Sequence, residues 1–92
     1  MTILYYYILV DPDKLNRCKL GITKNPKQRL RTYRTANPQC SFYHVYSIDD
    51  KKHEKKILDL LKDCFKVQQE YVYANPQLVK NIIDGYFLDK EL

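Results

Sequence analysis

The sequence has no tryptophan, only two glycines and four prolines among its 92 residues. So little glycine and proline excludes a low-complexity linker, and 45% hydrophobic with 29% charged residues is typical of a folded domain. No apolar run approaches the roughly 20 residues that span a bilayer. The longest candidate, residues 3–10, contains three tyrosines and follows no basic segment, which argues against a secretory leader. We therefore expect one domain over residues 1–92, with no membrane partner.

Cysteine is also scarce, and its spacing excludes the usual sulfur motifs. Cys18, Cys40 and Cys64 are too far apart for a Cys-x-x-Cys pair, so neither a zinc knuckle nor a redox motif is present. An odd number of thiols indicates a reducing compartment, where free cysteine behaves as a small hydrophobic residue. We expect an intracellular protein that is not secreted, in the cytoplasm or nucleus, or in the host cell if it is viral.

The positive charge lies in the first half of the chain. Residues 1–40 carry eight basic and two acidic residues, whereas residues 41–92 carry eight and nine, which together give the net charge of +5. All four arginines lie in the first half. Two interpretations fit: a solvated basic helix face, or a surface for a phosphate-bearing partner, since guanidinium groups match phosphate oxygens.

The hydrophobic pattern predicts an α+β domain, with a small, mainly antiparallel three-stranded sheet flanked by about three helices. Residues 3–10 are apolar at both parities, which is typical of a central strand covered on both faces. Asn25-Pro26 and Asn75-Pro76 are helix starts, because asparagine caps free amides and proline fits the first turn. We expect strands over residues 3–10, 17–22 and 41–48, and a short edge strand over Glu70–Ala74. We expect one helix over residues 26–34, a second from Asp49 or Asp50 to near Phe65, and a third that begins at Pro76.

The third expected helix has one apolar face, on which we place Leu78, Val79, Ile82, Ile83 and Phe87.

Glu54 interrupts the apolar face of the second expected helix. One turn back from Ile57, Leu58 and Leu61, the inward stripe reaches this carboxylate. Glu54 is either an ordinary first-turn acid favoured by the helix dipole, or a carboxylate directed into a cleft to hold a cation.

Arg29 is the second residue that breaks the pattern. It lies one turn before Tyr33 and next to Leu30, so we expect it half-buried at the border of the packed face. There it either satisfies a carboxylate or contacts a phosphate or a transition state. Arg31 and Arg34 are better candidates for the solvated face.

Nine tyrosines against three phenylalanines are unusual for a simple core. Each buried phenol needs a hydrogen-bond partner, so we expect most to be structural and one or two to orient water or phosphate near Arg29 and Glu54. His44 and His53 do not form a spaced metal-binding pair, and we interpret them as surface or core residues. The sequence has no Ser-His-Asp order, glycine-rich phosphate loop or paired-carboxylate cluster.

Together these residues resemble the GIY-YIG endonuclease superfamily, and more narrowly its compact branch in phages and large DNA viruses. The first motif lacks its glycine, and Lys19 replaces the tyrosine of the second motif. The matching segments are Tyr5-Tyr6-Tyr7-Ile8-Leu9, Lys19-Leu20-Gly21-Ile22-Thr23, Asn25-Pro26-x-x-Arg29-Leu30, Tyr33-x-Thr35-x-Asn37-Pro38, His53-Glu54 and Glu70-Tyr71-Val72.

The resemblance implies an endonuclease that hydrolyses DNA phosphodiester bonds with one divalent metal ion, Mg²⁺ or Mn²⁺ in its place. It implies that Glu54 binds the metal, Arg29 stabilises the transition state, and Tyr7 and Tyr33 orient water or phosphate. Lys19 is then either the general base or a phosphate contact. For nucleic-acid binding outside the catalytic group we expect Lys24, Lys27, Arg31 and Arg34.

The resemblance leaves the partner and the activity open in two respects. DNA is the expected partner of a monomer or weak homodimer, with RNA as the alternative polymer. The alternative function is a noncatalytic nucleic-acid-binding or interaction module on a nuclease-like fold, which binds through phosphates with strong salt dependence.

Overall fold

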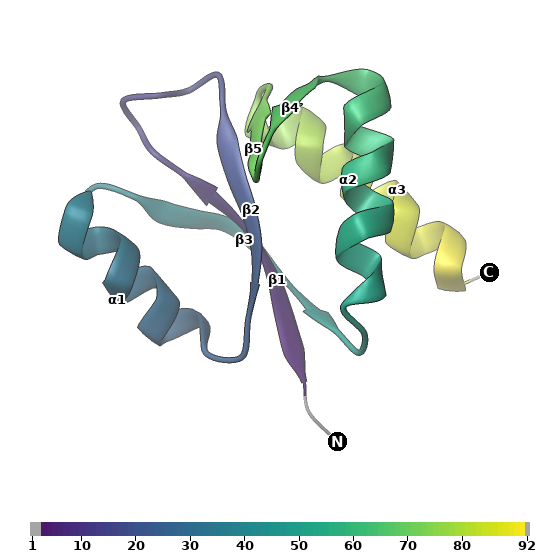
Figure 1. The fold of residues 1–92 in the computed structure, drawn as a ribbon, viewed down its shortest axis with the longest axis horizontal. Coiled ribbons are helices and arrows are strands. Elements are labelled where there is room, and N and C mark those ends of the chain that lie inside the picture. Colours follow the sequence, from purple (N-terminus) through teal and green to yellow (C-terminus); the bar gives the residue numbers. More distant parts are fainter. Residues whose placement is uncertain (1–2, 92) are drawn as a thin grey trace.

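The chain folds into five strands and three helices in the computed structural model, which describes residues 3–91 (Figure 1). In chain order the elements are β1 (Leu4–Val10), β2 (Cys18–Thr23), α1 (Pro26–Ala36), β3 (Ser41–Ile48), α2 (Lys52–Cys64), β4 (Lys66–Gln68), β5 (Tyr71–Tyr73) and α3 (Pro76–Glu91). The expected α+β class is confirmed, and the sheet has two more strands than the three we counted in the sequence pattern. None of the described helices is long and apolar enough to cross a membrane.

All strand pairs are antiparallel, in the order β3-β1-β2-β5-β4. Figure 1 shows α1 on one side of this sheet and α2 with α3 on the other. The predicted central strand is confirmed, since β1 lies between β2 and β3 and both of its faces are buried.

Two hydrophobic clusters hold the three layers together. Tyr6 and Ile8 of β1 belong to the larger cluster, with Ile57 and Leu61 of α2 and Ile83 of α3. The next residues along β1 point the other way, toward α1. The smaller cluster there is built from Tyr7, Leu9 and Cys40, with Leu30, Tyr33, Phe42 and Val45 packed against it. The alternation of side chains along β1 therefore sends one set of tyrosine and aliphatic residues to each helix layer.

Three local expectations were wrong. The strand expected at the sheet edge over Glu70–Ala74 is β5, which lies between β2 and the outer strand β4. Strand β4 was not expected, because its three residues carry too little alternation to be recognised. Gln69, with φ of 56°, lies in the tight turn that joins β4 to β5. Leu78 is 51% exposed, because the buried face of α3 is centred on Val79 and Ile83. Lys51, not an aspartate, precedes α2, although Asp50 Oδ1 accepts a hydrogen bond from the Lys52 N–H at 2.8 Å.

Asp84 connects α3 to β3 through a small polar network. Tyr46 Oη donates to its Oδ1 at 2.6 Å and Lys80 Nζ to its Oδ2 at 2.8 Å. Burial raises the pKa of Asp84, but the hydrogen bonds from Lys80 and Tyr46 outweigh burial and hold the pKa below its ordinary value. The ionised form therefore stabilises the fold above the unfolded-state pKa, and this contribution is lost as the pH falls through the folded-state pKa.

We expect Asp84→Asn to lower the free energy of unfolding near neutral pH, and the difference from the parent to shrink as the pH falls toward about 3. Urea unfolding across this range measures it. Asp89→Asn, an exposed site on the same helix, is the control and should show a smaller pH dependence. An equal loss for Asp84→Asn at both ends of the range would contradict the linkage.

Candidate active site

The ring of Tyr7 lies across β2 at Gly21, its direct partner in the antiparallel pair. A Cβ at position 21 would overlap Tyr7 Oη and lie 2.5 Å from Tyr7 Cζ. Tyr7 is only 1% exposed, and Phe42 holds its ring from β3 with centroids 5.0 Å apart. The glycine is therefore required by the close approach of a ring that has little room to move.

Tyr7 and Tyr33 form a phenol pair that joins β1 to α1. Their hydroxyl oxygens lie 2.6 Å apart, and the rings meet edge to face with centroids 6.0 Å apart. Burial, followed by the hydrogen bond with Tyr33, raises the pKa of Tyr7 well above its ordinary value, and Arg29 opposes this only in part. Tyr7 is therefore a neutral phenol that gives or accepts a hydrogen bond, and it is poorly suited to act as a base.

The start of α1 determines where Arg29 lies. Asn25 Oδ1 accepts from the Gln28 N–H at 3.1 Å, as the Asn-Pro motif predicted, and Thr23 Oγ1 accepts from the Asn25 N–H at 3.1 Å. Arg29 follows one turn later, with its N–H donating to Asn25 O at 3.0 Å. We expected this side chain to be half-buried, but it is exposed, and among the described side chains it has no carboxylate partner. Its guanidinium is therefore available to a ligand.

Arg29 and Glu54 line the same hollow, which has a volume of about 250 Å³. Arg29 reaches it from α1 on one side of the sheet, and Glu54 from the first turn of α2 on the other side. The β1–β2 pair provides the floor between them. The lining residues are Tyr7, Gly21, Ile22, Arg29, Lys51, Glu54 and Glu70.

Glu54 is a half-buried carboxylate in an environment that disfavours its charge. Burial raises the pKa of Glu54, and nearby Glu70 raises it further, while Lys51 lowers it in part. Within residues 3–91 no group of three or more His, Cys, Asp or Glu side chains is placed to hold a metal ion. This donor set does not fit zinc, which needs three or four protein ligands, but it fits Mg²⁺, which keeps several waters and uses one or two carboxylates with phosphate oxygens.

Lys19 lies at the edge of this region on β2. Its Nζ is 3.8 Å from Glu70 Oε2, and it also lies 4.9 Å from the ring centroid of Tyr33 and 5.5 Å from that of Tyr71. A carboxylate and two ring faces are the partners of a cation. Lys19 also lines a hollow together with Arg29.

The four residues expected to bind nucleic acid, Lys24, Lys27, Arg31 and Arg34, are exposed and line none of the hollows described for residues 3–91. Arg34 Nε also donates to Cys40 O at 3.0 Å, so part of this guanidinium is already engaged. None of the four therefore belongs to the lining that Arg29 and Glu54 share.

Two charged lining residues, Lys51 and Glu70, were not among the expected site residues. Glu70 belongs to the segment Glu70-Tyr71-Val72 that we had singled out, but only the β4–β5 turn brings it to the hollow. His53, beside Glu54, is held by Tyr86 Oη at 2.7 Å from its Nδ1 and by Asp49 Oδ1 at 3.1 Å from its Nε2. Because both ring nitrogens are engaged, a structural role for His53 agrees with the expectation.

The family model described as the T5orf172 domain matches residues 4–86. Neither the curated proteins nor the solved structures include one that matches the chain.

Proposed function

We propose that this chain is a metal-dependent endonuclease that hydrolyses DNA phosphodiester bonds through a GIY-YIG-like site. The chain belongs to the T5orf172 domain family of phage-type, nuclease-associated domains. The observation that carries the proposal is the shared hollow, which Arg29 and Glu54 line together with Tyr7 and Gly21. Arg29 is exposed and has no carboxylate partner among the described side chains, and Glu54 is half-buried. A guanidinium and a carboxylate that would hold a cation are what hydrolysis of a phosphodiester needs, since negative charge builds on the phosphoryl oxygens.

The residues of the candidate site have distinct tasks in this proposal. Glu54, with Glu70 nearby, would hold Mg²⁺, with Mn²⁺ able to replace it. When bound, the metal supplies positive charge that offsets the charge of the transition state. Arg29 donates two parallel hydrogen bonds to the non-bridging oxygens of the scissile phosphate, and Lys19 contacts a neighbouring phosphate.

The phenol pair has a positioning task. With its pKa raised by burial and by Tyr33, Tyr7 keeps its proton and hydrogen-bonds a phosphate oxygen or the attacking water. Tyr33 fixes the direction of that hydroxyl through the 2.6 Å bond. Attack forms one bond from the water oxygen to phosphorus and breaks the bond from phosphorus to the leaving alkoxide. The attacking water gives up a proton to bulk water, and the alkoxide takes up a proton from bulk water.

Nicking of supercoiled plasmid in Mg²⁺, in Mn²⁺ and in EDTA tests the proposal. We expect cleavage with either metal and none in EDTA, and we expect Arg29→Ala to slow cleavage by roughly 100-fold, as the loss of one preorganised oxyanion donor does. Lys62→Ala removes one positive charge from an exposed site on α2 that is remote from the hollow, and it should cut at nearly the parent rate.

Two outcomes would contradict the proposal. Equal rates for Arg29→Ala and Lys62→Ala would show that the site is misplaced. Metal-independent duplex binding without cleavage, under several metals and substrates, would favour the alternative of a noncatalytic binding module.

A further inference from the structure

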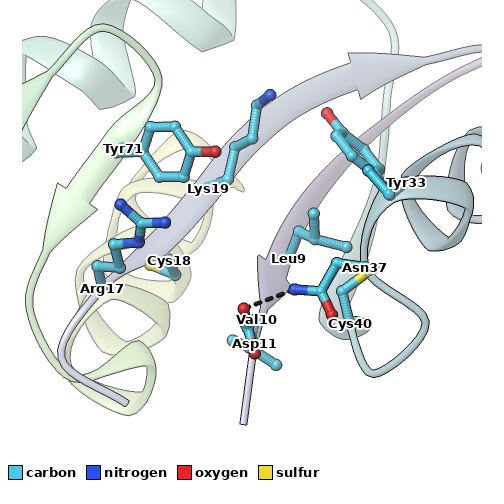
Figure 2. A pocket seen from close by; sticks show the side chains of 11 residues that line it. Leu9, Val10, Asp11, Arg17, Cys18, Lys19, Tyr33, Asn37, Cys40 and Tyr71 are labelled. Atoms are coloured by element: carbon cyan, nitrogen blue, oxygen red, sulfur yellow. Dashed lines mark hydrogen bonds between the residues drawn. The ribbon is translucent and has the colours of Figure 1, made fainter. Parts of the chain in front are cut away.

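A second hollow, with a volume of about 180 Å³, opens beside the first half of β2 (Figure 2). The rings of Tyr33 and Tyr71 stand on its two sides, with Lys19 between them. Its floor is formed by buried side chains that include Leu9 and Cys18. This volume is below the roughly 300–1,000 Å³ of pockets for drug-sized ligands, so it suits one small planar group.

Positive charge borders the hollow. The Arg17 guanidinium carbon lies 4.5 Å from the ring centroid of Tyr71, and Lys19 Nζ lies within 5.5 Å of both ring centroids. Two aromatic rings, an apolar floor and cations beside them are the elements with which proteins bind single-stranded nucleic acid, stacking the base and neutralising its phosphates. A base entering here would replace the Lys19 ammonium between the rings, and the ammonium would then contact a phosphate.

Two hydrogen-bonding side chains, Asp11 and Asn37, line the same hollow. Asn37 Nδ2 donates to Asp11 Oδ2 at 2.5 Å, as Figure 2 shows. Asp11 Oδ1 also accepts from the Asp13 N–H at 2.9 Å, so each carboxylate oxygen keeps one lone pair for a donor on the edge of a base, whereas the carboxylate would repel a phosphate. The hollow is therefore better suited to the base than to the phosphate of a nucleotide.

This hollow is next to the candidate active site along the surface. Lys19 and Tyr33 also line a polar hollow beside α1, together with Thr23 and Arg29. Arg29 in turn lines the hollow that contains Glu54. Shared residues thus connect the three hollows in one series.

We propose that the hollow between Tyr33 and Tyr71 binds an unpaired nucleobase of DNA, while Lys19 and Arg17 contact the adjoining phosphates. A base stacked within a duplex has no free face for these rings, so the pocket selects DNA with a nucleotide outside the helix. The binding site is defined independently of cleavage, but the further conclusion, that the scissile phosphate is near this unpaired nucleotide, rests on the proposed function.

Binding of the full chain to three labelled duplexes in EDTA tests this inference. One duplex carries a single unpaired adenine, the second an abasic residue at the same place, and the third is fully paired. We expect the adenine duplex to bind at least about five-fold more tightly than the abasic one, since stacking on an aromatic ring contributes substantially for each base. In a duplex that carries 2-aminopurine in place of the adenine, binding of the protein should quench the fluorescence of the 2-aminopurine.

Variants at position 71 locate the effect. Tyr71→Leu should remove the preference for the unpaired base, and Tyr71→Phe should retain it because the ring remains. Tyr73→Leu is the matched control, since Tyr73 is an exposed tyrosine on the same strand that does not line this hollow. Thermal unfolding of each variant separates loss of binding from loss of fold.

The outcomes distinguish this inference from the proposed function. Equal affinity for the adenine and abasic duplexes, or tighter binding of a matched RNA, would overturn the inference even if the protein nicks plasmid. A retained preference for the unpaired adenine that depends on Tyr71 would support it even if no cleavage occurs, and only the hydrolase proposal would then fail.

Discussion

Replacing Glu54 by glutamine is expected to reduce Mg²⁺-dependent nicking of DNA by at least about 1,000-fold, because metal catalysis supplies several kcal/mol of the stabilisation and each 1.36 kcal/mol changes the rate tenfold. Glutamine keeps the size of the side chain but lacks the charge that holds a cation. Asp59→Asn is the matched control, because Asp59 is an exposed acid on the same helix that does not line the hollow. Similar losses for both variants would contradict the role of Glu54.

The same substitution should make the metal-free protein more stable. Burial and Glu70 raise the pKa of Glu54 in the folded state. The folded state therefore favours the protonated form, and this contribution, present at low pH, is lost as the pH rises through the folded-state pKa. At neutral pH the parent carries an unfavourable charge, which Glu54→Gln removes. Thermal unfolding in EDTA measures this gain.

Addition of Mg²⁺ should reverse the order of stability. A ligand that binds only the native state raises its stability by mass action, so Mg²⁺ should raise the melting temperature of the parent and leave that of Glu54→Gln unchanged. A lower melting temperature for Glu54→Gln in EDTA would indicate that Glu54 is a structural acid, as the first-turn interpretation holds.

Local signals in the sequence were enough to predict most of the fold. The double-sided apolar run at Leu4–Val10 identified the central strand, and the Asn25-Pro26 pair placed the start of α1 at the correct residue. Both depend on interactions within a few residues. Strand β4 depends instead on pairing with β5, and its three residues carry no period from which a strand can be recognised.

The candidate site was predictable only in part, for a related reason. Arg29 and Glu54 were singled out because each breaks the pattern of its own helix. Lys51 and Glu70, which line the same hollow, break no local pattern, and only the packing of α2 and the β4–β5 turn against the sheet brings them there. The exposure of Arg29 was missed because helical spacing gives the direction of a side chain and not the depth of its neighbours.

Adding one methyl group at Gly21 should affect both the fold and the site. We expect Gly21→Ala to lower the free energy of unfolding by about 1–3 kcal/mol, the usual effect of overpacking a core. The new Cβ would overlap the Tyr7 hydroxyl, and the ring cannot turn aside without disturbing Phe42 and Tyr33. Urea unfolding measures the loss, and nicking should fall with it because Tyr7 would leave its place in the hollow.

The other glycine provides the control for this substitution. Gly85 lies within α3, and a Cβ there would have no neighbour within 4 Å. Gly85→Ala should therefore stabilise the protein by about 0.5–1 kcal/mol, the helix-propensity difference between the two residues. If the cost at position 21 comes from the ring of Tyr7, it should largely disappear in a Tyr7→Leu background, because leucine lacks the atoms that the new methyl group would meet. An undiminished cost in that background would place the conflict in the backbone of β2, and Gly21 would then serve the strand and not the site.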